Sequence, residues 1–314
     1  MRVGAIDIGT NSVLLTIAEL DGVMLRPLLE RATITRLGRG VDQHRRLKKD
    51  AVERTLACLR EYAAALEAAR TDELSVVGTS ALRDAGDSDS FLDRAEAILG
   101  RRPRVIEGDE EARLTFIGAL SGLTVSDPVC VFDIGGGSTE IVSGTRMPLG
   151  IHTQSSLDVG SVRLYERYVR SDPPAASELG RVNDEVRRAL SSVAPPLKDA
   201  VCVGVAGTVT TMAAVWQKLD SYDPALVHGT TLSRNAVDAV QKTLARLPLE
   251  ARRRVPGLDP ARADVIVTGI AVTQGLMDWA RAPELTVSDR GVRWGLLYEI
   301  VERGQKGLEP PEGS

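Results

Sequence analysis

The residues of this chain best suited to chemistry lie in two glycine turns, each preceded by an aspartate. AIDIGTNSVLLTIAE at 5–19 and VFDIGGGSTEIV at 131–142 both spell D-I-G-x-x-S. Glycines let a turn bring backbone N–H groups within hydrogen-bonding distance of phosphate oxygens, and serine and threonine hydroxyls add donors. The aspartates Asp7 and Asp133 repel phosphate, so each needs a cation or water in between. The pattern predicts a site for phosphate and a divalent metal.

A second pair of glycine turns follows in the same order. Gly78 in VVGTSA follows Asp7, and Gly207 in GVAGTVT follows Asp133, at nearly equal separations along the chain. A lone D-I-G turn is more often a bend in a sheet, but two matched pairs of turns favour a duplicated phosphate-binding unit. Two such turns facing each other across a cleft would bind a polyphosphate and a metal from both sides.

Alternating strands and helices are expected to position the first pair of turns. β-branched runs around glycine predict strands, and apolar residues with three-and-four spacing predict amphipathic helices. In chain order the predicted elements are strands at 2–8 and 12–19 around Gly9, a third strand after the DG pair at 21–22, a helix over 48–70, a strand and a glycine turn in 73–85, a helix ending at Gly100, a strand in PRVIEG, and a helix from Asp109.

The pattern restarts after SGLTVSDP at 121–128, where small and turn-forming residues gather. The elements predicted for the second half are strand, turn and strand in 129–144, two helices around 160–192, a buried strand at 200–207, a helix from 208, and a core helix over 263–280. We therefore predict an N-terminal domain at 1–124, a C-terminal domain at 125–303 and a frayed tail at 304–314.

Composition and charge exclude several kinds of partner. A length of 314 residues exceeds the usual size of one hydrophobic core and favours two domains. The 4% of aromatic residues argue against base stacking, and the net charge of −4 gives no overall positive field for nucleic acid or a lipid surface. Basic clusters at 43–50, 100–104 and 251–255 are each, taken alone, typical of a solvated face or loop.

The three cysteines, Cys58, Cys130 and Cys202, show neither a disulfide framework nor metal-site spacing. We expect them to be buried small hydrophobic residues in a reducing compartment. The sequence opens with a strand rather than a charged and apolar leader, and no apolar run is long enough to cross a bilayer. A cytoplasmic location is expected.

Five motifs together resemble the exopolyphosphatase and guanosine pentaphosphate phosphohydrolase family, within the actin, sugar kinase and heat-shock chaperone ATPase superfamily. They are AIDIGTNSVLL, VVGTSALRDA, EGDEEARLTFIGAL, VFDIGGGSTEIV and GVAGTVTTMAA. The resemblance implies an α/β fold of two ribonuclease-H-like, actin-like ATPase domains, with mixed sheets flanked by helices and a cleft between the domains. It also implies removal of the terminal phosphate from inorganic polyphosphate, guanosine pentaphosphate or both, with a divalent metal, for which we expect Mg²⁺ or Mn²⁺.

The resemblance assigns roles to individual residues. Glu111 in DEEAR matches the family's proposed catalytic base, which orients and deprotonates the attacking water. Asp133 and Glu140 match carboxylates implicated in metal and water binding, and Asp7 is the corresponding aspartate of the first half. The positions that match phosphate contacts are Thr10, Asn11, Ser12, Arg83, Gly135, Gly136, Gly137, Ser138, Gly207 and Thr208.

These roles agree with the chemistry of phosphoryl transfer, which needs positioning, charge neutralisation and a carboxylate to guide water. Because Glu110 and Glu111 are adjacent on a predicted helix, only one of them can point into a given cleft. Without the family match, Glu111 is equally explained as an acid near a helix N-terminus or on the surface, and Arg83 as a member of a surface ion pair.

Two departures from the family pattern bear on function. Arg290 in VSDRGVRWGLLYE stands where many relatives have glycine, so an extra cation near the cleft is conceivable. Longer relatives continue into a helical region that holds long polyphosphate chains and forms dimer contacts. Short polyphosphates are therefore the expected substrates, and whether the protein forms a homodimer is left open.

Three functions remain open from the sequence. The first is a metal-dependent phosphohydrolase acting on polyphosphate or guanosine pentaphosphate. The second is an ATP-dependent kinase of the same superfamily, because AGTVTTMAA could equally hold an adenosine-linked phosphate. The third is a sensor that binds such anions without catalysis and reports to a partner.

Overall fold

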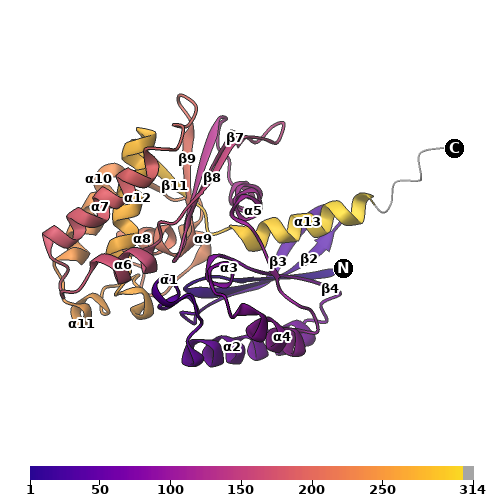
Figure 1. Ribbon diagram of the computed structural model, residues 1–314. Helices are drawn as coiled ribbons and strands as arrows, with labels where there is room; N and C mark the ends of the chain where they lie inside the picture. The colour runs from indigo at the N-terminus through magenta and orange to yellow at the C-terminus, as the bar shows by residue number, and fades with distance from the viewer. Residues whose placement is uncertain (307–314) are drawn as a thin grey trace. The chain divides into compact units, whose positions relative to one another are not determined.

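The computed structural model describes residues 1–306, which form two compact units (Figure 1). The first unit contains Met1–Glu107 together with the helix that begins at Val292, and the second contains Gly108–Gly291. Each unit is built on one mixed sheet of parallel and antiparallel strands. The expected class, mixed α/β sheets with flanking helices, is confirmed.

The first unit contains ten helices and strands among the described residues. They are β1 (Arg2–Ile8), β2 (Ser12–Asp21), β3 (Met24–Ile34), α1 (Val41–His44), α2 (Lys49–Ala68), β4 (Glu73–Gly78), α3 (Ser80–Asp84), α4 (Ser88–Leu99), β5 (Arg104–Val105) and α13 (Val292–Lys306). The elements predicted for this half are present, and Gly100 ends α4 in the left-handed conformation that glycine favours (φ 68°).

The second unit contains a larger sheet and more helices. Its elements are α5 (Gly108–Leu120), β6 (Val129–Ile134), β7 (Thr139–Thr145), β8 (Gly150–Leu157), α6 (Ser161–Tyr168), α7 (Ala176–Leu190), β9 (Val201–Val205), α8 (Ala206–Gln217), α9 (Pro224–Val227), β10 (Thr231–Ser233), α10 (Arg234–Ala245), α11 (Leu249–Arg252), the 3₁₀ turn η1 (Pro260–Arg262), α12 (Ile266–Ala280) and β11 (Glu284–Val287).

The two sheets share one strand topology. The first has the order β3-β2-β1-β4-β5, and the second contains β8-β7-β6-β9-β11 with β10 added at its edge. In both, the first three strands of the unit are antiparallel neighbours. The next two strands continue the sheet in parallel from the first. The duplication inferred from the paired glycine turns is therefore present in the strand order itself.

The division into units differs from the predicted boundary between residues 124 and 125. Helix α5 packs against β6, β7 and β8, so it belongs to the second unit. Helix α13 packs on β1 and β2 of the first unit, where Trp294 Nε1 donates to Glu30 Oε1 (3.0 Å) and the Arg293 guanidinium pairs with the same carboxylate (3.2 Å). Because α13 extends to Lys306, residues 304–306 are helical rather than frayed, and 307–314 lie outside the described residues.

Strand β8 was not expected from the sequence. Its residues are mostly exposed or half-buried and largely polar, so they carry no buried-strand signal. Its counterpart β3 is similarly exposed but was found through the DG turn that precedes it. The short strands β10 and β11 were also missed, because three or four residues give too little periodicity to detect.

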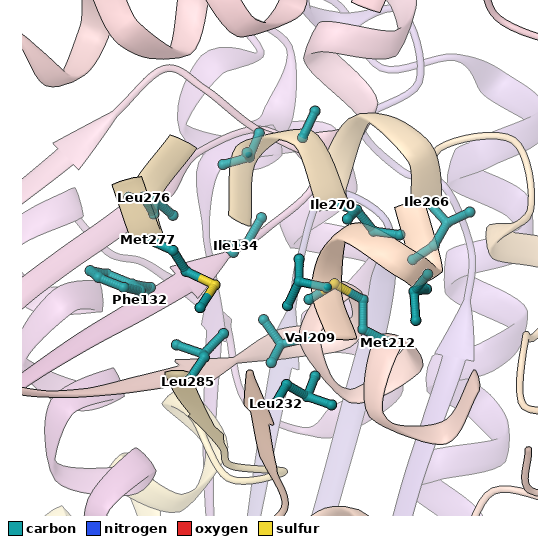
Figure 2. Close-up of a cluster of buried hydrophobic side chains, with 14 of the residues drawn as sticks. Phe132, Ile134, Val209, Met212, Leu232, Ile266, Ile270, Leu276, Met277 and Leu285 are labelled. Carbon is teal, nitrogen blue, oxygen red and sulfur yellow. The ribbon is translucent and has the colours of Figure 1, made fainter. Parts of the chain in front are cut away.

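The core of the second unit lies between its sheet and helices α8 and α12. Figure 2 shows side chains from β6, α8 and α12 converging on one another. Among the fully buried members are Phe132, Ile134, Met212 and Ile270. Ten of the fifteen residues of α12 are buried, so the expectation of a core helix over 263–280 is confirmed.

The three cysteines are buried and form no disulfide, as expected. Burial raises the pKa of Cys130 and of Cys202 to about 12, so neither supplies a thiolate near neutral pH. None of the helices formed by the described residues combines the length and apolar character needed to cross a bilayer.

Glu178 makes the second unit sensitive to acid. Its carboxylate accepts hydrogen bonds from Ser171 Oγ (2.6 Å) and from the N–H groups of Ala175 (2.9 Å), Arg170 (2.8 Å) and Ser171 (3.2 Å). These bonds, that from the Ser171 hydroxyl foremost, lower the pKa of Glu178 to about 2. Because the pKa is lower in the folded state, this stabilisation is complete above the unfolded-state pKa of about 4.3 and is lost as pH falls towards 2.

We therefore expect Glu178→Gln to lower the melting temperature at pH 7 and to weaken its fall between about pH 4.5 and pH 2. Thermal unfolding followed by circular dichroism across this pH range measures both effects. Asp184→Asn is the matched control, because Asp184 lies exposed on the same helix. A pH profile of Glu178→Gln that coincides with the control would contradict the assignment.

Candidate functional site

The glycine turn between β6 and β7 is anchored through its carbonyl groups. Gly135 N–H donates to Ser138 O at 3.1 Å and closes the turn. The carbonyl oxygens of residues 135–137 accept hydrogen bonds from the start of α6. The donors are the N–H groups of Ser161 (3.0 Å), Val162 (2.9 Å) and Arg163 (3.0 Å) and the Nε of Arg163 (2.6 Å). Within residues 1–306, the N–H groups of Gly136, Gly137 and Ser138 donate no hydrogen bond, so three amides are available to an anion.

The turn between β1 and β2 is anchored in the same way. Asn11 O accepts from the N–H groups of Thr35 (3.0 Å) and Arg36 (2.9 Å), and Thr10 O accepts from Gly38 N–H (2.8 Å). The N–H groups of Thr10 and Asn11 donate no hydrogen bond to any described residue. In both turns, therefore, the carbonyl oxygens accept hydrogen bonds from a neighbouring segment, and the N–H groups named above can donate to a bound ligand.

Asp133 and Glu140 lie opposite each other on β6 and β7. Residues paired directly across antiparallel strands point to the same face of a sheet, so the two carboxylates are neighbours. Thr115 Oγ1 donates to Asp133 Oδ2 (3.0 Å), and Ser156 Oγ donates to Glu140 Oε1 (2.8 Å). Burial raises the pKa of Asp133 to about 6, and the Thr115 hydrogen bond opposes that rise.

Glu111 lies in the first turn of α5, on the helix that covers β6, β7 and β8. It precedes Thr115 by one helical turn, so the two share one helix face, and Thr115 is the residue that holds Asp133. Glu111 is 6% exposed, whereas Glu110 is half-buried. Glu111 is therefore the more buried of the two glutamates, and it lies on the helix that packs against the strands of Asp133 and Glu140. Which of the two points into a cleft stays a prediction.

Gly207 and Thr208 are the second and third residues of α8, which follows β9 directly. A Cβ placed on Gly207 would lie 1.9 Å from Nη1 of Arg262, so the absence of a side chain lets this guanidinium lie against the helix start. Burial lowers the pKa of Arg262, an effect opposed by Asp259 among others. The Gly207 turn therefore carries a half-buried cation that sequence reasoning did not find.

The predicted residues of the first unit lie at the end of β1 and on α3. Asp7 pairs in register with Leu14 of β2 and Val77 of β4. Arg83 Nη1 donates to Ile106 O at 2.7 Å. Asp7, Thr10, Asn11, Ser12 and Arg83 thus belong to one unit, and the other predicted residues to the second. Their convergence on one anion stays a prediction.

The carboxylates of β6 and β7 suit a hard divalent cation. Among residues 1–306, no group of three His, Cys, Asp or Glu side chains is arranged to hold a metal ion. Mg²⁺ commonly keeps several waters and binds one or two carboxylates together with substrate phosphates. Asp133 and Glu140 fit such a shared site, in which the substrate supplies the remaining ligands.

Arg290, the departure from the family pattern, follows β11. Its Nη1 donates to Ser121 Oγ at 3.3 Å. A Cβ on Gly122 would lie 2.7 Å from the same Nη1, so the arginine lies against the end of α5. This places the cation within the second unit, beside the segment that follows the Glu111 helix.

Sequence reasoning missed the residues that support the site. Gly160 and Arg163 support the glycine turn at 135–138. Thr115 and Ser156 orient Asp133 and Glu140, and Arg262 lies against Gly207. The duplication offered a partial signal, because the first turn also needs a supporting segment. That segment is a loop in the first unit and a helix start in the second, so sequence likeness could not reveal the equivalence.

Comparison with known families agrees with this arrangement. The model of the Ppx/GppA phosphatase family matches residues 16–304. The chain belongs to the Ppx/GppA phosphatase family. This confirms the resemblance drawn from the five motifs and the expectation of a hydrolase.

Individual members of the Ppx/GppA family match over most of the chain. Exopolyphosphatase 2 of Mycobacterium tuberculosis is 36% identical over 317 residues, covering 96% of this chain and 98% of that protein. A guanosine-5'-triphosphate,3'-diphosphate pyrophosphatase of Photobacterium profundum is 28% identical, covering 95% of this chain and 59% of that protein. The crystal structure of the Aquifex aeolicus Ppx/GppA family member superposes with a TM-score of 0.82 at 34% identity and covers 99% of both chains.

Proposed function

We propose that this protein removes the terminal phosphate from inorganic polyphosphate, guanosine pentaphosphate or both, with a divalent metal. The observation that carries the proposal is the packing of α5 against the sheet of the second unit. There Glu111, Asp133 and Glu140 accompany a turn whose three amides donate to no other described residue. Family membership and the names of two relatives support the same reaction.

The amides of residues 136–138 would bind oxygens of the terminal phosphoryl group and stabilise the charge that spreads over them. Glu111 would orient a water and accept its proton as the water oxygen bonds to the terminal phosphorus. The bridging P–O bond breaks, orthophosphate is released, and the shortened chain leaves as an anion. Burial of Glu111 restricts its rotamers, which would keep its carboxylate oriented toward that water.

Asp133 and Glu140 would hold the cation, which neutralises phosphate charge when bound. Thr115 and Ser156 fix the orientation of the two carboxylates through one hydroxyl each. A cytoplasmic location and a homodimer stay predictions.

The decisive experiment measures orthophosphate release by the purified protein from polyphosphate, guanosine pentaphosphate and ATP. We expect release from one or both of the first two in Mg²⁺ or Mn²⁺, loss of release in EDTA, and its return when metal is restored. Release from ATP alone would instead favour a kinase-like protein. Binding of polyphosphate without release in either metal would favour a sensor and contradict the proposed hydrolase.

A further inference from the structure

The stretch Arg36–Lys49, termed the basic segment, carries six Lys or Arg and one Asp. Four of its exposed cations have no carboxylate at ion-pairing distance within residues 1–306. They are Arg39, Arg46, Lys48 and Lys49. An exposed arginine beside them, Arg45, does pair with Asp84 (3.3 Å). The segment therefore exposes a concentrated positive charge that carboxylates of the described residues offset only in part.

The other two basic clusters of the sequence are used differently. In the cluster at 100–104, Arg102 pairs with Asp89 at 3.0 Å and also with Asp93. In the cluster at 251–255, Arg252 is buried and donates to three carbonyl oxygens. Arg102 and Arg252 are thus engaged within the fold, so a basic composition does not by itself leave cations exposed and unpaired.

The basic segment begins at the first phosphate turn. Arg36 N–H donates to Asn11 O, and Arg36 reaches this position in the left-handed conformation (φ 56°), which an arginine rarely adopts. Farther along, Arg45 O accepts from Gly86 N–H (3.0 Å), and α1 contacts α3, the helix that carries Arg83. The segment thus runs from the turn at 9–12 to the neighbourhood of Arg83, entirely within the first unit.

We propose that the basic segment binds the part of a polyphosphate chain that lies beyond the terminal phosphates. The proposal rests on the proposed function, since it deepens the choice of substrate. The four exposed cations belong to the segment that begins at the turn at 9–12, so phosphates beyond the terminal ones would meet positive charge there. Such binding makes longer polyphosphates the better substrates, which differs from the expectation from the sequence that short chains are preferred.

The chemistry favours polyphosphate over nucleic acid as the occupant. The basic segment contains no Phe, Tyr or Trp on which bases could stack. Its backbone is bonded to a turn whose own amides suit phosphate oxygens, so a ligand made only of phosphates meets suitable donors throughout.

The test compares two variants that each lose four exposed positive charges. The first combines Arg39→Gln, Arg46→Gln, Lys48→Gln and Lys49→Gln. The control combines Arg60→Gln, Lys198→Gln, Lys242→Gln and Arg254→Gln, all exposed positions elsewhere. We expect the first variant to raise KM for long-chain polyphosphate about tenfold and to change KM for tripolyphosphate less than about threefold. Its KM should also depend less steeply on salt. The control should match the wild type.

The outcomes separate this inference from the proposed function. If the wild type hydrolyses polyphosphate and both variants behave alike, the basic segment has no role and the hydrolase stands. If the wild type hydrolyses nothing, the hydrolase fails, and binding of labelled long-chain polyphosphate in EDTA decides the inference. If the control variant still binds long-chain polyphosphate and the first variant does not, the inference is supported. If both variants bind it equally, the inference is overturned. A second outcome also overturns the inference: the wild type binds a single-stranded RNA as tightly as polyphosphate, and the first variant loses both ligands equally.

Discussion

Glu111→Gln is expected to lower kcat for phosphate release about a thousandfold, because a positioned general base contributes on the order of 10²- to 10⁴-fold. Glutamine keeps the size of the side chain and cannot accept a proton from water. Glu111 is buried on the face of α5 that carries Thr115, so the substitution leaves packing near Asp133 unchanged. Affinity for polyphosphate should therefore be retained, as measured by equilibrium binding beside steady-state kinetics.

Glu110→Gln is the matched control for this prediction. Glu110 lies one residue earlier on the same helix and is half-buried, so it points to a different side of α5. The same chemical change there should leave kcat within about twofold of the wild type, since no base is removed. Full activity of Glu111→Gln would remove Glu111 from the mechanism and leave the water without a guiding carboxylate.

The sequence predicts the parts of this molecule that obey a local rule. Strand periodicity and the glycines at 9 and 135 locate the turns, and their repetition reveals the duplication that the shared strand order confirms. Helix α5 is recognisable from its first-turn acids at Asp109, Glu110 and Glu111. Such signals lie in a few adjacent residues, so they can be read without knowledge of the tertiary structure.

Features that depend on contacts distant in sequence could not be predicted. The carbonyls of the second turn are held by residues 161–163, which are far enough along the chain that no local pattern connects them. Assignment of α5 to the second unit depends on its packing against the sheet, whereas the sequence offered only the turn-rich stretch at 121–128. The guanidinium of Arg262 lies on Gly207, although α8 and several further elements separate the two residues along the chain.

The anchoring of the glycine turns explains how they can bind anions at all. A flexible glycine turn would lose conformational entropy on binding, which weakens affinity. Here each turn is held in place by hydrogen bonds to its carbonyls, so its amides are oriented before a ligand arrives. The same physical solution in both units, reached with different supporting segments, indicates that the orientation of the amides matters more than the supporting sequence.

Gly160→Ala tests that explanation. A Cβ at residue 160 would lie 2.5 Å from Gly136 O and 2.6 Å from the carbonyl carbons of Gly136 and Gly137, so the turn must move away from α6. Residue 160 has extended dihedral angles (φ −149°, ψ 161°) that alanine also adopts, and the effect is therefore steric. We expect kcat/KM for polyphosphate to fall about 100-fold, the cost of displacing a stabilising backbone donor. Overpacking should also cost about 1–3 kcal/mol of stability.

Gly180→Ala provides the comparison for Gly160→Ala. Gly180 lies inside α7, where a Cβ would meet no atom within 4 Å. Alanine there should stabilise the protein by about 0.5–1 kcal/mol through helix propensity and leave kcat/KM unchanged. Kinetics at a temperature where both variants are folded separates the two effects. Wild-type activity in a folded Gly160→Ala protein would show that the turn amides need no anchoring, and the proposed role of residues 136–138 would lose its structural basis.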